Sequence, residues 1–347
     1  MSDPKPRPYR IATYNIEWFN SLFDSRGRPK EDESWSSRYE ITHRQQLGAL
    51  GTVLRHVDPD ALMVIEAPDD GPGRHTVDML ETFAARSGLR ARKAVFGFAN
   101  ETQQEIAALY DPDRLTLRHD PQGGGAGEAP RFDATFPADL TGDGRQTPMA
   151  FNKPPLELAA LTAGGTAFRM IGMHAKSKAP HGATTPEAVR RLAIENRRKQ
   201  YAECQWVRGR VLDILAARQP VMVMGDLNDG PGLDEYEQLF GRSGVEEVLG
   251  WNEPRATRLF DPHAKQALGQ RNAAAPTTAR FYNDTEKRYF TAILDYLMVS
   301  QDLRARHPHW RIWHPFDDQA CYVDEDLRKA LLDASDHFPV SIDIALD

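Results

Sequence analysis

The segment Val221-Met222-Val223-Met224-Gly225-Asp226-Leu227-Asn228 places four apolar residues directly before a glycine, an Asp and an Asn. An apolar run that is closed by glycine and followed by residues 229–232 (DGPG) is typical of an interior β-strand that ends in a loop. In strand geometry Asp226 and Asn228 point to the same side. A carboxylate beside a carboxamide suits a site that orients water or an anionic oxygen near a metal. These are also ordinary turn residues, so a plain turn is the alternative.

Length and composition favour one large domain. The 347 residues exceed the usual size of a single domain, but no change of composition marks a linker. We expect a Pro-rich tail over residues 1–9 and one domain over residues 10–347. No apolar run approaches the roughly 20 residues of a membrane span, and the first residues contain no signal core, so we expect a cytoplasmic protein. The net charge of −7 argues against capture of nucleic acid by the whole surface.

Two features that can indicate metal binding have simpler explanations. Cys204 and Cys321 are too few for a disulfide framework or a zinc site. Residues 139–144 (DLTGDG) begin like a calcium-binding loop, but Ala150 stands at position twelve, where such a loop needs Glu. We therefore expect a turn-rich loop there.

Polar residues recur within or beside the other predicted strands. In the first of these strands two polar side chains share one face, and in the others an ionisable residue stands at one end. The strands and their polar residues are 10–19 with Asn15 and Glu17, 61–65 with Glu66, 106–110 with Glu105, and 167–173 with His174 and, beyond it, Lys176. Taken alone, Asn15 and Glu17 fit an exposed polar face, Glu105 is better explained as a surface residue, and a histidine such as His174 after a strand usually has a structural role.

The last two predicted strands bring an acid and a histidine. Asp295 interrupts the apolar row of residues 292–299. Burying a carboxylate is unfavourable unless it is paired, and a histidine is a natural partner. Asp336 and His337 stand at the start of the alternating strand over residues 340–346.

Helices and loops fill the remaining segments. Residues 185–217 form a long helical pattern that is locally basic, which fits either a solvated helix face or a rim that contacts phosphate. A short helix is expected over residues 233–240. The polar region over residues 251–289 is expected to be irregular and to hold substrate-contacting loops.

Four short motifs, in this order along the chain, resemble those of the endonuclease/exonuclease/phosphatase superfamily, and more specifically its deoxyribonuclease-like branch. The motifs are Thr13-Tyr14-Asn15-Ile16, Gly225-Asp226-Leu227-Asn228, Leu294-Asp295-Tyr296 and Ser335-Asp336-His337-Phe338-Pro339. The resemblance covers nearly the whole chain. It implies an α/β fold, a four-layer sandwich in which two mostly antiparallel β-sheets pack face to face with helices outside. It also makes residues 10–347 a single catalytic domain.

The resemblance further implies roles for the polar residues. For a divalent metal it implies Glu66 as the principal ligand, with Asn15, Asp336 and Glu17 as further candidates. Asp226 and Asn228 would orient the attacking water and the phosphate. The implied acid–base pairs are His337 with Asp295 and His174 with Glu105, and Lys176 would contact phosphate.

Three departures from the superfamily pattern blur the branch without removing the chemistry. Ile65 precedes Glu66 where many relatives have Gln, and Glu17 stands where some have Asp. Residues 152–155 (NKPP) replace an Arg-Pro-Pro of some nucleases.

Oxygen ligands with few histidines suit a hard cation such as Mg²⁺ or Mn²⁺, which positions a phosphate for in-line attack. We therefore expect metal-dependent hydrolysis of phosphodiester bonds, with nucleic acid as the favoured substrate and no obligate protein partner. A phosphomonoesterase or a lipid phosphodiesterase is the alternative within catalysis, because fold does not fix substrate. A catalytically silent binding module is the alternative outside it.

Overall fold

The computed structural model describes residues 7–140, 143–180, 182–230, 240–269, 275–283 and 287–347. Most of the expected tail over residues 1–9, and nearly all of the helix expected over residues 233–240, lie outside these residues. Within the described ranges, no helix combines the length and the apolar character needed to cross a membrane.

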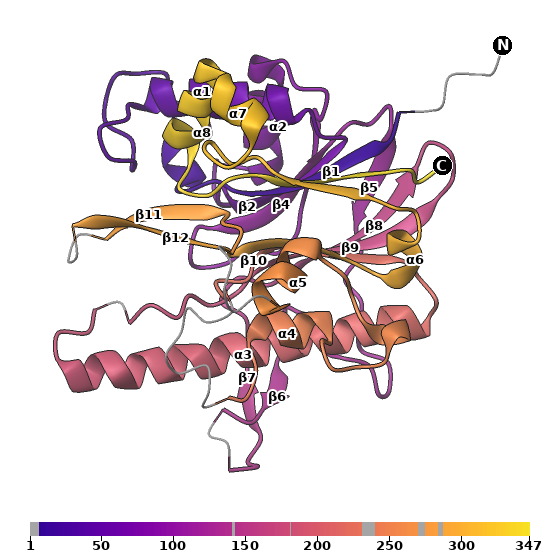
Figure 1. The fold of residues 1–347 in the computed structure, drawn as a ribbon. Coiled ribbons are helices and arrows are strands. Elements are labelled where there is room, and N and C mark those ends of the chain that lie inside the picture. The colour runs from indigo at the N-terminus through magenta and orange to yellow at the C-terminus, as the bar shows by residue number, and fades with distance from the viewer. Residues whose placement is uncertain (1–6, 141–142, 181, 231–239, 270–274, 284–286) are drawn as a thin grey trace.

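Two large sheets pack face to face (Figure 1). In each sheet one neighbouring pair is parallel, β1 with β2 and β9 with β10, and the other pairs are antiparallel. The first sheet has the order β14 (His309–Ile312), β15 (Val340–Ile344), β1 (Tyr9–Asn15), β2 (Ala61–Ala67), β4 (Glu105–Tyr110), β3 (Lys93–Phe96). The second has the order β13 (Asp295–Val299), β10 (Val221–Asp226), β9 (Ala167–His174), β8 (Leu156–Thr162), β5 (Leu115–His119).

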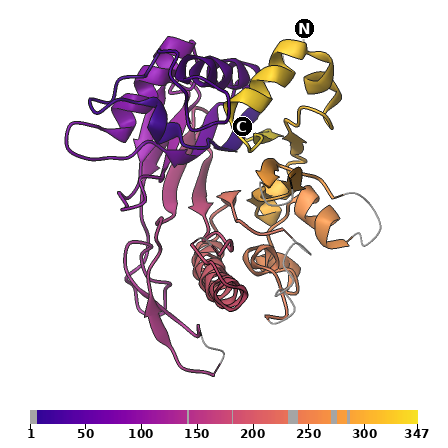
Figure 2. The same ribbon diagram turned by 90° about the vertical axis from the view of Figure 1, so that its left-hand side faces the viewer.

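Helices cover the outer faces of both sheets (Figures 1 and 2). One apolar cluster lies between the sheets, and a further cluster lies between each sheet and its helices. The helices on the first sheet are α1 (His43–Val57), α2 (Thr76–Ser87), α7 (Gln319–Val323) and α8 (Glu325–Ala334), and those on the second are α3 (Pro186–Ala216), α4 (Gly244–Leu249) and α5 (Pro262–Gly269). The expected four-layer α/β sandwich is confirmed.

Shorter elements complete the described chain. They are η1 (Phe19–Leu22), η3 (Arg255–Thr257), α6 (Gln301–Arg304), the β6–β7 hairpin (Phe136–Ala138 and Thr147–Met149) and the β11–β12 hairpin (Ala279–Asn283 and Arg288–Ala292). Figure 1 shows that the β11–β12 hairpin and the first half of α3 project from the same end of the sandwich.

Strand β10 shows why its sequence is a continuous apolar run. Its valines belong to the cluster beneath the helices and its methionines to the cluster between the sheets, so both faces are buried. Gly225 has a φ of 130°, and a Cβ there would lie 2.0 Å from the carbonyl oxygen of Met173. Only glycine allows this close approach of β9 to β10.

Sequence patterns predicted α3 well and the region over residues 251–289 poorly. Thr185 caps α3 by accepting the N–H of Ala188, and Pro186 begins the helix. The region expected to be irregular instead contains η3, α5 and the β11–β12 hairpin. In the calcium-like segment, Asp139 accepts the N–H of Gly144 at 2.9 Å, which fits the expected turn, and residues 141 and 142 lie outside the described chain.

Candidate active site

Strand ends bring most of the expected site residues together at one edge of the sandwich. Asp226, at the end of β10, lies opposite His174 on β9 and opposite Asp295 on β13. From the facing sheet, Asn15 at the end of β1 donates its side-chain N–H to Asp226, with an Nδ2–Oδ2 distance of 3.0 Å. This buried hydrogen bond joins the two sheets at the site.

Asp226 and Asn228 meet through a turn. Strand β10 ends at Asp226, and Asn228 has a φ of 48°, so the strand geometry on which their pairing was predicted is wrong. Asp226 Oδ1 accepts the backbone N–H of Asn228 at 2.7 Å, and the Asn228 amide donates to the carbonyl oxygen of Ala175 at 3.0 Å. The amide nitrogen also lies 3.3 Å from Asp226 Oδ2. The left-handed turn thus brings the carboxylate and the carboxamide side by side.

Burial sets the protonation of Asp226. Burial raises the pKa of this carboxyl, the positive charge of His337 opposes the rise and the charge of Asp295 adds to it, so that the pKa moves from the ordinary value of 3.8 to about 7. Asp226 is therefore poised to exchange a proton near neutral pH.

The expected contact between Asp295 and His337 is present. Nδ1–H of His337 donates to Asp295 Oδ2 at 2.7 Å, and both side chains are buried. Burial alone would lower the pKa of His337, but the charge of Asp295 and this hydrogen bond outweigh burial and raise the pKa well above its ordinary value. His337 is therefore held as an imidazolium.

Thr278 orients Asp295, and sequence reasoning missed it. Its hydroxyl donates to Asp295 Oδ2 at 2.8 Å and accepts the backbone N–H groups of Leu294 and Asp295 at 3.0 Å each. Because the two N–H groups occupy the oxygen lone pairs, the hydroxyl proton points at the carboxylate. Thr278 stands in the region that was expected to be irregular, where no apolar pattern marks it.

His174 does not pair with Glu105, and that prediction is wrong. His174 Nε2 lies 3.6 Å from Asp226 and 3.9 Å from Glu66, whereas Glu105 accepts N–H groups from the backbone and side chain of Asn100. His174 is the last residue of β9, whereas Glu105 is the first residue of β4 in the other sheet and lies at a bulge opposite Ala67 of β2. Burial raises the pKa of Glu105 to about 7.

Lys153 is a second site residue that sequence reasoning missed, because it was noted only as part of the replaced Arg-Pro-Pro motif. Its Nζ lies 3.1 Å from Nδ1 of His174. Burial, and next the charge of Lys153, lower the pKa of His174 well below its ordinary value, so this imidazole is neutral at pH 7. Lys176 lies nearby, with its backbone N–H bound to Glu203 at 2.6 Å.

Glu66 stands on strained backbone at the end of β2. Its φ is 62°, at a bulge between Ile65 and Ala67, and such strain persists only where the surrounding structure imposes it. Burial raises the pKa of Glu66, which Lys153 and His337 oppose. The bulge turns the carboxylate toward the site.

Glu17 and Asp336 complete a group of acids around Glu66. Glu17 forms an ion pair with Arg38, yet burial, and next the charge of Asp336, raise the pKa of Glu17 to about 7. Asp336 Oδ1 lies 4.0 Å from Nε2 of His337. The carboxylates of Glu17, Glu66 and Asp336 are thus close enough to repel one another.

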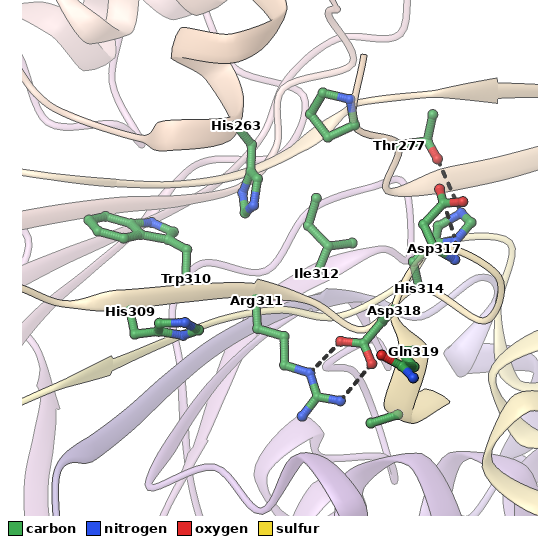
Figure 3. Close-up of a pocket in the computed structure, with 12 residues that line it drawn as sticks. His263, Thr277, His309, Trp310, Arg311, Ile312, His314, Asp317, Asp318 and Gln319 are labelled. Carbon is green, nitrogen blue, oxygen red and sulfur yellow. Dashed lines mark hydrogen bonds and ion pairs between the residues drawn. The ribbon is translucent and has the colours of Figure 1, made fainter. Parts of the chain in front are cut away.

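A cavity of about 600 Å³ lies outside this group of residues (Figure 3). It is lined by β14, the start of α7 and the segment before β11, and none of the expected site residues lines it. His314 in its wall contacts the hydroxyl of Thr277 at 3.1 Å. Thr277 directly precedes Thr278, so this wall of the cavity adjoins the residue that orients Asp295.

Comparison with known families decides the affiliation of the chain. The model described as "Endonuclease/Exonuclease/phosphatase family" matches residues 12–337. The chain belongs to this family. As a member of the endonuclease/exonuclease/phosphatase family it is a hydrolase that acts on phosphoester bonds. A search among curated proteins finds no match.

Solved structures of similar fold include several enzymes. Truncated TDP2 of Caenorhabditis elegans is 16% identical, with 97% of this chain and 98% of that chain covered and a TM-score of 0.48. An AP endonuclease from Archaeoglobus fulgidus is 14% identical, with 97% and 99% covered and a TM-score of 0.49. Mannosyl-6-phosphatase Bt3783 of Bacteroides thetaiotaomicron VPI-5482 is 13% identical, with 97% and 99% covered and a TM-score of 0.47.

Enzymes of the endonuclease/exonuclease/phosphatase family typically use divalent metals, and the donor set here fits such an ion. Across the described ranges, no three His, Cys, Asp or Glu side chains already converge as a complete metal cage. However, Asn15 Oδ1 is buried without a hydrogen-bond partner. This amide oxygen and the repelling carboxylates of Glu66 and Asp336 are hard oxygen donors that a divalent cation would stabilise.

Proposed function

We propose that the chain is a divalent-metal-dependent phosphodiesterase that hydrolyses nucleic acid. The observation that supports this proposal most directly is the setting of Asp226. This buried carboxyl accepts hydrogen bonds from Asn15 and Asn228, and the positive charge of His337 favours its ionised form. An acid–base group, an amide and an imidazolium around one point are the groups that phosphoryl transfer needs for placement and charge stabilisation.

Glu66, Asn15 and Asp336 are the residues we propose to hold Mg²⁺ or Mn²⁺, with Glu17 as a further candidate. When bound, such a cation supplies neutralisation of the phosphate charge. Because Glu17 already forms an ion pair with Arg38, we propose it only as a supplementary ligand.

Asp226 and Asn228 are the proposed pair that orients the attacking water. With a pKa of about 7, Asp226 is ionised in a substantial fraction of molecules at neutral pH and can accept a proton from that water. The Asn228 amide, fixed on Ala175, positions the water or a phosphate oxygen.

His337 and Lys153 are the proposed cations for the phosphate. Asp295 takes the Nδ1–H of His337, which leaves Nε2–H to donate to a phosphate oxygen. Neutral His174 and Lys176 are proposed to contact the same phosphate on the side of Lys153. Glu105 has no part in this proposal because it is bound to Asn100.

Nucleic acid is the favoured substrate because exposed arginines stand on a helix that projects from the site end, although the whole chain is acidic. Arg190 and Arg191 are exposed on the half of α3 that projects from this end (Figure 1). Arginines on a projecting helix suit the contact with a repeating phosphate backbone.

The experiment is hydrolysis of a labelled oligonucleotide and of a phosphomonoester in parallel, with Mg²⁺, with Mn²⁺ and with chelator. We expect metal-dependent cleavage of the oligonucleotide that is lost in Asp226→Asn and retained in Asp78→Asn, a change of the same kind on the exposed face of α2. Activity on the monoester alone would overturn the nuclease proposal, and no activity on either would overturn the enzyme class.

A further inference from the structure

The β11–β12 hairpin carries aromatic side chains on both of its faces. Tyr282 and Tyr289 form one cross-strand pair, with ring centroids 5.2 Å apart, and Phe281 and Phe290 form the next, at 6.3 Å. Such pairs stabilise a hairpin, which would be a sufficient explanation if the rings were covered. Three of the four rings are largely uncovered, since Tyr282 is 49%, Tyr289 54% and Phe290 43% exposed, whereas Phe281 is half-buried.

The hairpin is hydrogen-bonded directly to the segment just before β15, which contains Asp336 and His337. Ala279 forms a β-bridge with His337, and the backbone N–H of Arg280 donates to the carbonyl oxygen of Asp336 at 2.7 Å. The ring of Phe281 meets that of His337 edge-on, with centroids 5.7 Å apart. The base of the hairpin is therefore joined to the residue that is proposed to contact the phosphate.

Arg280 adds positive charge to the aromatic surface. Its guanidinium carbon lies 3.3 Å from the ring centroid of Tyr289 and 5.8 Å from that of Phe316. Among the residues that the structure describes, no carboxylate stands within ion-pair distance of this guanidinium. Exposed rings beside a cation match a ligand that offers flat bases and phosphates together.

We propose that the β11–β12 hairpin is a base-stacking platform, formed by Tyr282 and Tyr289 with Arg280 on one face of the hairpin, that holds unpaired bases of a single-stranded nucleic acid beside the active site. Unpaired bases present their faces to aromatic side chains, whereas the bases of a duplex are already stacked on each other. The assignment rests on the proposed nuclease function for its biological meaning, but binding can be measured without hydrolysis.

The test is fluorescence anisotropy with the full chain in chelator, which prevents metal-dependent turnover. Three ligands of about 12 nucleotides are compared: a single strand, an abasic strand with the same backbone, and the matching duplex. The variants are Tyr282→Ala with Tyr289→Ala, the same two positions changed to Phe, and Tyr322→Ala on α7 as an exposed control.

We expect the double Ala variant to bind the single strand about 10-fold or more weakly, while its affinity for the abasic strand changes little. The Phe variant keeps the rings and should bind like the wild type, which also shows that the hairpin tolerates substitution. Equal losses on the two strands, tighter wild-type binding of the duplex, or no wild-type binding of the single strand would each overturn the proposal. Binding to anionic vesicles that depends on the two tyrosines, in place of binding to the single strand, would assign the hairpin to lipid instead.

The proposed function is checked separately by hydrolysis of bis(nitrophenyl) phosphate by the wild type. This substrate has no bases, so a failure of hydrolysis and a failure of base stacking give different results.

Discussion

Thr278→Val tests whether a single buried hydroxyl holds Asp295 in place. Valine has nearly the same shape, so the change removes three hydrogen bonds of 2.8 to 3.0 Å and leaves packing almost unaltered. Thr278 is fully buried, so water cannot replace the hydroxyl for the N–H groups of Leu294 and Asp295. Each unsatisfied buried group costs about 1–3 kcal/mol, and a hydrogen bond to a charged group contributes about 1.5–3 kcal/mol.

We therefore expect Thr278→Val to lower the free energy of unfolding by about 3 kcal/mol or more. The assay is urea unfolding, in which the midpoint should fall while the dependence of stability on urea concentration stays the same. Thr278→Ser is the matched control, because it keeps the hydroxyl and should lose only about 1 kcal/mol for the missing methyl group. If the Val and Ser variants were equally stable, the hydroxyl would not be holding the carboxylate and the assignment of Thr278 would be wrong.

Three further changes address the other parts of the site. Glu66→Gln should weaken the affinity for Mg²⁺ or Mn²⁺ measured by calorimetry, and an unchanged affinity in a folded variant would remove Glu66 as a ligand. Asp295→Asn should lower the pKa of His337 in an NMR titration. The wild-type pair contributes to the free energy of unfolding fully below about pH 6.5, and this contribution is lost as the pH rises through the folded pKa of His337. Asp295→Asn should remove this contribution. An unshifted His337 titration would show that the two residues do not interact. Lys153→Met should raise the pKa of His174, because the Lys153 charge helps to lower it, whereas Lys153→Arg should not; equal pKa values in both variants would contradict the contact.

Sequence patterns predicted the layers of the fold because buried positions in helices and strands are apolar at regular intervals along the sequence. Residues 221–224 are continuously apolar since both faces of β10 are covered, and the alternation over residues 340–346 follows from a strand with a half-buried outer face at Asp343. The β11–β12 hairpin was missed because its rings are exposed, so no apolar periodicity marks its strands.

The sequence predicted that the site residues stand at strand ends, but it predicted few of the contacts between their side chains. Asp295 and His337 could be paired because a carboxylate in an apolar row needs a partner. The pairing of His174 with Glu105 failed because the two stand on strands of different sheets, and their separation depends on sheet packing, which local pattern does not encode. Lys153 and Thr278 likewise contact the site from loops, where neither spacing nor periodicity distinguishes them.

The most direct test of the central claim is the metal-dependent kcat/KM of Asp226→Asn on bis(nitrophenyl) phosphate, measured beside the wild type and Asp78→Asn. Because the proposed role of Asp226 is to accept the proton of the attacking water, we expect a loss of about 10²–10⁴-fold for Asp226→Asn and none for Asp78→Asn. This substrate needs no proton on its leaving group, so the loss would report on the attack itself. A kcat/KM for Asp226→Asn within about twofold of the wild type would contradict the claim that this carboxyl activates the water.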